Sequence, residues 1–204
     1  RAANTLGGLD AVWKTSSFAG DKDFLVGAWW AGSRGDLPEG QRTGWGFKVD
    51  YPNDLWDVNV NVNEFGEALS PSLGFLPRPG TRQWSGAAEY MPRPREGPLA
   101  ALVHQLFFEL EGQLVTDLSG RQESWEVVAV PLNVRLKSGD QAQVGFGREY
   151  ELLTEPFEVE DGVAIPPGRY EFTRSRLEAT SSSKRRWRAG GEVVWGGFYS
   201  GRLT

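Results

Sequence analysis

The 204-residue chain contains no cysteine and only one histidine, His104. Without cysteine it can form no disulfide, no thiolate metal site, no iron–sulfur cluster and no thiol nucleophile. A single histidine leaves little room for a multi-histidine metal site or a Ser-His-Asp triad. Because His104 lies among Leu102, Val103 and Leu106, we interpret it as a hydrogen-bonded residue of a mostly apolar segment, not as a ligand or a base. The sequence therefore predicts no metal and no cofactor.

Long apolar runs and an excess of positive charge are missing as well. The longest apolar stretches, near residues 24–32 and 127–132, fall well short of the roughly 20 residues that a membrane-spanning helix needs. The 27 acidic residues outnumber the 22 basic ones, which is the reverse of the balance typical of nucleic-acid-binding proteins. We expect neither helical membrane spans nor a nucleic-acid partner.

The chain begins at Arg1, with no initiator methionine or signal peptide. It ends at Thr204, directly after an aromatic, strand-like segment. We therefore expect a piece of a longer protein. No linker, repeat or low-complexity segment divides it, so we predict a single domain over residues 1–204.

Large rings are abundant in spite of a low average hydropathy. Nine Trp, eleven Phe and five Tyr accompany a mean hydropathy of −0.43. About ten segments alternate apolar and polar residues with a period of two, and clusters of Gly, Asp, Asn, Ser and Pro separate them. This is the pattern of antiparallel strands. The sequence predicts an all-β fold, an antiparallel up-and-down meander of about ten strands.

The clearest alternation covers residues 54–64. Its apolar face carries Trp56, Val58, Val60 and Val62. Its polar face carries Asp57, Asn59, Asn61 and Asn63. Unpaired buried amides are costly, so the polar row must face water or hydrogen-bonding partners. An alternation of this length matches the 9–11 residues of a membrane-spanning strand better than the 5–6 of a typical soluble strand.

Turn-forming residues mark the connections. Residues 20–23, 138–140 and 181–184 carry Gly, Asp and Ser in patterns that suit hairpin turns. Longer connections are expected at residues 32–42 and 64–80. Within the second of these, residues 71–78 form either a rigid turn, which we favour, or an inward-folded plug. Residues 99–111 also fit a helical face, but the neighbouring pattern favours a strand.

Alternation by itself fits two architectures, because a soluble β-sandwich turns its apolar face inward and a membrane barrel turns it toward lipid. Long alternating runs, and rings near segment ends such as Trp30, Trp56 and Tyr199, favour the barrel. A barrel with rings on its outer face and polar residues in its interior would also explain why many rings accompany a low mean hydropathy. We expect most of a transmembrane-type β-barrel. The expected lipid-facing residues are Trp56, Val58, Val60, Val62, Val144 and Phe146, and the expected polar interior is Asp57, Asn59, Asn61 and Asn63.

Residues 65–78, with the sequence FGEALSPSLGFLPR, resemble a signature of an uncharacterised bacterial outer-membrane family. Weaker similarities at residues 4–10, 138–140, 155–170 and 197–201 extend the resemblance over nearly the whole chain. In that family a carbohydrate-binding-like β-sandwich precedes a C-terminal β-barrel domain of unknown function. The resemblance implies that this chain is most of the barrel domain, located in the bacterial outer membrane against lipid or lipopolysaccharide. It also implies that missing strands or a partner chain complete the barrel.

Acidic residues cluster at Asp50, Asp54 and Asp57 and at Glu64 with Glu67, which raises the question of paired glycosidase carboxylates. None of them lies in the strongly apolar sequence context that a catalytic acid needs. We interpret them as residues of a polar interior or of solvated loops, and we predict no catalytic residue.

The one basic run consists of Lys184, Arg185, Arg186 and Arg188 around Trp187. Arginine forks and a neighbouring ring suit phosphates or the anionic sugars of lipopolysaccharide, so this run is a candidate anion-binding site. The alternative is a solvated hairpin beside a membrane-embedded strand.

The sequence thus predicts a non-catalytic region of an outer-membrane β-barrel that supports binding or passage of carbohydrate or another polar solute at the bacterial surface. The alternative function belongs to a soluble β-sandwich or jelly-roll domain that binds or hydrolyses polysaccharide. The two architectures make opposite demands on Val60, because the first exposes it to lipid and the second buries it between sheets.

Overall fold

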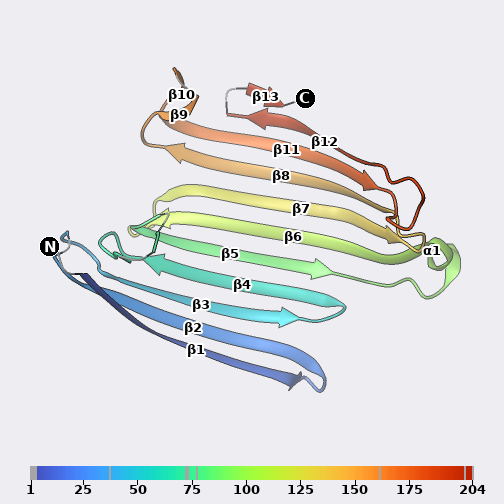
Figure 1. Cartoon of the computed structure of the whole chain (residues 1–204), viewed down its shortest axis with the longest axis horizontal. Coiled ribbons are helices and arrows are strands. Elements are labelled where there is room, and N and C mark those ends of the chain that lie inside the picture. The colour runs from blue at the N-terminus through green and yellow to red at the C-terminus, as the bar shows by residue number, and fades with distance from the viewer. Residues whose placement is uncertain are drawn as a thin grey trace. The chain divides into compact units, whose positions relative to one another are not determined.

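The computed structural model describes residues 4–36, 38–71, 74–76, 78–160, 162–199 and 201–203 (Figure 1). Its strands are β1 (Asn4–Phe18), β2 (Lys22–Gly35), β3 (Thr43–Pro52), β4 (Trp56–Phe65), β5 (Thr81–Tyr90), β6 (Val103–Asp117), β7 (Gln122–Leu136), β8 (Gln141–Leu153), β9 (Phe157–Glu160), β10 (Val163–Ile165), β11 (Gly168–Thr180), β12 (Gly190–Phe198) and β13 (Gly201–Leu203). The helix α1 (Gly97–Leu102) has six residues. Among the described residues, no helix is both long and apolar enough to cross a membrane.

Eleven strands form one sheet in the order β1-β2-β3-β4-β5-β6-β7-β8-β11-β12-β13, and β9 pairs with β10 separately. The prediction of an all-β antiparallel meander is confirmed. The described residues form more strands than the predicted ten or so: eleven in the main sheet and two in the β9–β10 hairpin, which is inserted between β8 and β11. The strand order is open, with β1 and β13 at its ends, and no pairing in the described part of the chain closes it.

Local sequence explains where several elements begin and end. The predicted turns at residues 20–23 and 138–140 join β1 to β2 and β7 to β8. The predicted strand over residues 99–111 is correct only from Val103, where β6 begins. Residues 99–102 belong to α1, because Pro98 occupies the first turn of a helix, where no N–H donor is needed. Pro131 lies within β7, and the register with β8 shifts between Ala129 and Leu132, as expected for a residue that cannot donate to the ladder.

Contacts within the chain divide it into two compact units. Unit 1 comprises the described residues of Arg1–Asn53, Val58–Gly86 and Gln113–Glu123. Unit 2 comprises the described residues of Asp54–Asp57, Ala87–Gly112 and Ser124–Thr204. We describe each unit separately.

The sheet of unit 1 has one apolar and one polar face, which the strand register identifies. Trp30 of β2 lies opposite Leu9 of β1 and Trp45 of β3, and directly opposed residues share a face. This is the apolar face of unit 1. On the other side, Trp29 lies opposite Gly46, Gly27 opposite Lys48, and Leu25 opposite Asp50. We call this the polar face of unit 1.

Unit 2 has the same division. Val144 of β8 lies opposite Leu132 of β7 and Leu177 of β11, and Leu177 lies opposite Val193 of β12. These residues mark the apolar face of unit 2. The adjacent residue Gln143 lies opposite Asn133 and Glu178 on the other side, which is the polar face of unit 2. The next residues of β8 on that face are Gly145, Gly147 and Glu149.

Candidate functional site

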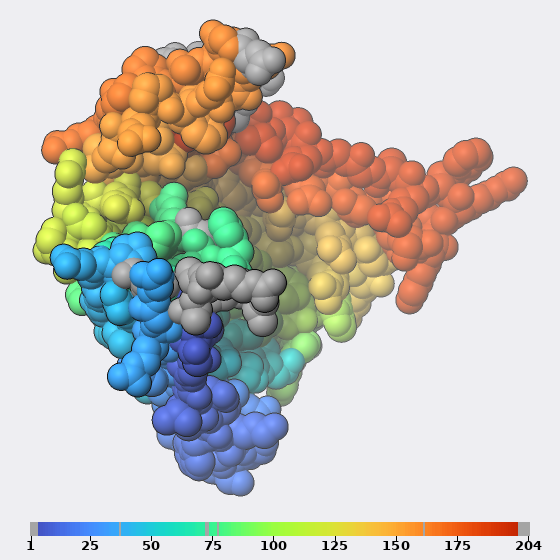
Figure 2. Space-filling view, turned by 60° about the vertical axis from the view of Figure 1, so that its left-hand side comes forward, coloured from blue at the N-terminus to red at the C-terminus, as the bar shows by residue number. Residues whose placement is uncertain are grey.

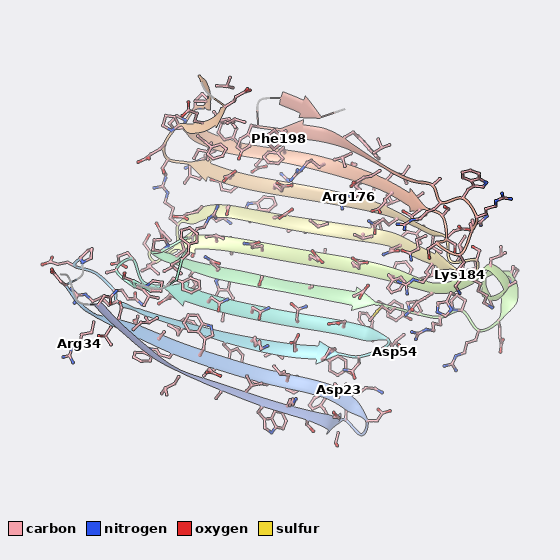
Figure 3. The ribbon with its side chains drawn as sticks, in the orientation of Figure 1. Asp23, Arg34, Asp54, Arg176, Lys184 and Phe198 are labelled. Atoms are coloured by element: carbon pink, nitrogen blue, oxygen red, sulfur yellow. The ribbon has the colours of Figure 1, made fainter. Side chains whose placement is uncertain are left out.

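The polar face of unit 2 carries a hollow of about 300 Å³. It is lined from β6, β7, β8, β11 and β12, and its charged lining residues are Glu111, Glu126, Glu149, Arg174 and Arg176. A second hollow of about 110 Å³ is lined by Asn133, Gln141, Gln143, Glu178 and Thr180. Gln143 lines both hollows, so they are contiguous. We call them together the polar groove, and Figure 3 marks Arg176 on β11 within it.

Two glycines of β8 create the space in the polar groove. Gly145 pairs with Arg176 of β11, and Gly147 pairs with Arg174. A Cβ atom at either position would meet no heavy atom closer than 3.8 Å, so the backbone would tolerate a side chain there. Such a side chain would point into the groove, which therefore depends on the small size of these two residues.

Arginine–carboxylate pairs cross the polar groove. The Nε of Arg174 donates to Oε1 of Glu149 at 2.8 Å. The Nε of Arg176 lies 2.7 Å from Oε1 of Glu192, in a pair that is more exposed to solvent. Because both pairs remain partly exposed, their contribution to stability is small, and the guanidinium groups keep donors available for a solute.

Amides and acids fill the rest of the lining. Gln143 donates to Glu178 at 2.8 Å, and Asn133 of β7 donates to Glu109 of β6 at 3.2 Å. Within the described residues, Glu111 forms no ion pair. The groove thus offers donors and acceptors side by side with a surplus of carboxylate, a lining that suits hydroxyl, amide and charged groups of a small polar solute.

The predicted polar row of residues 57–63 is divided between the two units. Asn59, Asn61 and Asn63 lie on the polar face of unit 1, because Asn63 Oδ1 accepts a hydrogen bond of 2.9 Å from Trp29 Nε1 on that face. A Cβ atom at Gly46 would stand 2.1 Å from this ring nitrogen, so only glycine leaves room for the contact. Asp57 belongs to unit 2.

The β4–β5 connection folds over the polar face of unit 1. The N–H of Ser70 donates to Ser33 Oγ at 3.2 Å, and Asn4 Nδ2 donates to the carbonyl of Ser70 at 2.8 Å. Ser33 lies on the same face of β2 as Trp29, four residues along the strand. These contacts hold residues 68–70 against the polar face of unit 1, but they precede residues 71–78, for which the choice between a rigid turn and an inward-folded plug stays a prediction. Of the predicted segment 71–78, the residues Ser72, Leu73 and Pro77 lie outside the described part of the chain.

Glu64 is a buried hydrogen-bonding centre that the sequence did not reveal. Its Oε1 accepts from Gln41 Nε2 at 3.0 Å and from Trp45 Nε1 at 3.1 Å. Its Oε2 accepts from Arg82 Nε at 2.8 Å, and Arg82 Nη2 completes a bidentate contact. The carboxylate is thus committed to tying β3, β4, β5 and the β2–β3 connection together, which supports a structural and not a catalytic role.

The predicted lipid-facing residues lie on the apolar faces of their units, and all except Val62 are exposed or half-buried. Val60 is 52% exposed, Phe146 47% and Trp56 46%. Val58 and Val144 are half-buried. Val62 is only 8% exposed, so it is part of a core, although the period of two places it beside Val60.

The basic run lies in the β11–β12 connection, residues 181–189. Figure 2 shows these orange-red atoms of unit 2 standing clear of their neighbours, and Figure 3 labels Lys184 among them. Arg185 Nε donates to Asp140 Oδ1 at 3.1 Å, and its Nη2 contacts the other carboxylate oxygen. Lys184, Arg186 and Arg188 form no ion pair within the described residues. Three of the four predicted anion-binding cations are therefore free to meet a ligand, and the fourth holds the loop.

Asp140 anchors this connection from the β7–β8 turn. Its pKa falls to about 2, first because the Ser138 hydroxyl donates to it, then because the N–H of Ser182 and the Arg185 guanidinium do. The Ser182 contact measures 2.8 Å. The charged form of Asp140 therefore holds the β11–β12 connection at neutral pH.

Within the described residues, no three acidic or histidine side chains are arranged to hold a metal ion. No family model, no curated protein and no solved structure matches the chain. The resemblance to an outer-membrane family through residues 65–78 accordingly stays a prediction.

Proposed function

We propose that the chain is a membrane-embedded wall of the outer-membrane β-barrel type, whose polar groove supports binding or passage of carbohydrate or another polar solute at the bacterial surface. In this proposal the apolar faces of both units contact lipid and the polar faces line an aqueous interior. The region itself is non-catalytic, and missing strands or a partner chain complete the barrel.

The observation that carries the proposal is the exposure of large apolar side chains on one face of each unit. The buried apolar residues in the described part of the chain are few, namely Val62, Ala68, Leu69, Val103, Val115 and Phe172. Exposed apolar patches beyond a few hundred Å² are unusual on soluble monomers. Lipid stabilises such faces, whereas a soluble sandwich would bury them between two sheets.

In unit 1 both ends of the apolar face carry rings. At one end Phe18 stacks on Phe24 with ring centroids 4.6 Å apart and meets Tyr51 edge-on at 6.3 Å. Toward the other end Trp30 lies opposite Trp45. Between these ends lie the smaller residues Val26, Ala28 and Val49, together with the rings of Trp13 opposite Val26 and Phe47 opposite Ala28. Rings at both ends of such a face are typical of membrane-interface girdles.

Unit 2 repeats this arrangement. Tyr90 packs between Trp56 at 4.6 Å and Phe108 at 6.1 Å. Toward the opposite end of the strands, Trp125 stacks on Tyr150 at 6.3 Å. Tyr150 shares a face of β8 with Val144, Phe146 and Arg148, and Arg148 forms an exposed ion pair with Glu171 near this end. Exposed rings and aliphatic side chains on one face of each unit favour a lipid environment for both faces.

The solute-binding part of the proposal rests on the polar groove and predicts that Gly145→Trp weakens binding. The indole would fill much of the 300 Å³ hollow without displacing the backbone, since a Cβ atom there meets only ordinary contacts. We expect maltotriose, titrated calorimetrically into the detergent-solubilised chain, to bind at least about tenfold more weakly, which corresponds to about 1.4 kcal/mol.

The matched control is Val144→Trp, one residue away on the apolar face. It adds a similar ring where lipid or detergent accepts it, so its affinity for maltotriose is expected to stay at the wild-type value. If both variants lose affinity for maltotriose equally, or if neither loses any, the polar groove is not the solute-binding site.

A further inference from the structure

Three connections of unit 2 are bonded to one another at the same end of its strands. The N–H of Lys137, in the β7–β8 turn, donates to the carbonyl of Leu102 at the end of α1 at 2.8 Å. The N–H of Ser182, in the β11–β12 connection, donates to Asp140 of the β7–β8 turn. These bonds make one continuous rim from α1, the β7–β8 turn and the β11–β12 connection.

Positive charge is concentrated on this rim. Its exposed cations are Arg95, Lys137, Lys184, Arg186 and Arg188, and none of them forms an ion pair within the described residues. We call these five residues the basic rim. The acids near them are Glu96, which is exposed, Asp54, which pairs with Arg93, and Asp140, which Arg185 engages. The rim therefore has a clear positive surplus on a chain whose net charge is −5.

The opposite end of unit 2 has the reverse charge. The connection from β8 to β11, residues 154–167, contains Glu155, Glu158 and Glu160 and no Lys or Arg. It follows the end of β8 at Leu153, whereas the basic rim flanks the start of β8 at Gln141. Positive charge thus lies at one end of the strands of unit 2 and negative charge at the other, a separation that solubility alone does not require.

Exposed apolar groups accompany the cations. Leu99 and Leu102 of α1 are 59% and 68% exposed, and Trp187, within the basic run, is 81% exposed. A short apolar helix and a tryptophan among lysines and arginines are the composition of segments that lie at the boundary between headgroups and acyl chains.

We infer that the basic rim binds the phosphate groups of anionic lipid headgroups at one membrane interface, with Leu99, Leu102 and Trp187 inserted beside them. Arg185 is a positioning residue, because its contact with Asp140 fixes the loop that carries Lys184, Arg186 and Arg188. This inference rests on the proposed function, since it places that end of unit 2 at a membrane surface.

The test compares vesicles of phosphatidylcholine with vesicles that also contain phosphatidylglycerol, by flotation of the 204-residue chain at low salt. We expect tighter association with the anionic vesicles. The triple variant K184A/R186A/R188A should lose roughly 100-fold of its affinity for them, since each interfacial cation contributes about a fivefold factor. High salt should abolish the preference.

The control variant R34A/R121A/R169A removes the same charge from exposed cations outside the rim and should keep the preference for anionic vesicles. Circular dichroism identifies any variant that fails to fold, and Trp187→Ala then provides a second test, with an expected loss of affinity. Equal affinity of the wild type for both vesicles, or equal losses in both triple variants, would contradict the basic rim. So would lipid-independent binding of inorganic phosphate. Failure of the wild type to insert into either vesicle would instead contradict the proposed function.

Discussion

Val60→Arg is expected to prevent insertion of the chain into phospholipid vesicles. Val60 lies in the middle of β4 on the apolar face of unit 1 and is half exposed. An arginine on a lipid-facing strand costs about 2–4 kcal/mol near the bilayer midplane, equivalent to roughly 30- to 1,000-fold in the insertion equilibrium. The measurement is the inserted fraction, taken from protease protection and from heat-modifiable migration on gels.

Asn61→Arg is the matched control, because it introduces the same side chain one residue away on the polar face. Water or polar partners can solvate the guanidinium there, so insertion should match the wild type. If the purified wild-type chain is monomeric and soluble without detergent, or if Val60→Arg inserts as well as Asn61→Arg, the apolar face does not meet lipid.

Glu64→Ala is expected to cost about 2–3 kcal/mol of the free energy of unfolding, measured by urea titration in detergent micelles. Removing one member of a buried ion pair typically costs 3–5 kcal/mol. The expected value is lower because Arg82 is 37% exposed and can turn to water. Trp45 and Gln41 would also lose their acceptor. Glu64→Gln should cost less, since an amide oxygen can still accept.

Glu67→Ala provides the comparison for Glu64→Ala. Glu67 is an exposed acid three residues along the chain, and surface substitutions of this kind usually change stability by less than about 0.5 kcal/mol. Equal effects of the two alanine variants would contradict the role of Glu64 as the centre of a buried network.

The two faces of each strand were predictable because the side-chain period of a strand is two. Residues 56–63 needed no tertiary information to place Val60 and Asn61 on opposite sides. β1 carries a weaker alternation around Gly7 and Gly8, and it is ordered through pairing with β2 from Asn4 to Thr15. The first and last residues of such a strand are determined by its pairing with the neighbouring strand, so the alternation of its own sequence could not predict them.

The functional side chains were less predictable, because they depend on contacts far apart in the sequence. Glu64 shares the parity of the valines, so the alternation gave no sign that Gln41, Trp45 and Arg82 converge on it. The engagement of Arg185 by Asp140 joins residues 45 positions apart. The polar groove arises where Gly145 and Gly147 face arginines of β11, a juxtaposition that only the strand register determines.

The most direct test of the lipid-facing assignment is a nitroxide scan of β4. The chain has no native cysteine, so single cysteines at Val58, Asn59, Val60 and Asn61 can each be labelled in the otherwise unchanged, vesicle-reconstituted protein. Collision rates with oxygen, which partitions into lipid, and with a water-soluble nickel chelate are then compared. We predict that oxygen dominates at 58 and 60 and the chelate at 59 and 61. Chelate access at all four positions, or no alternation, would contradict a membrane-embedded wall.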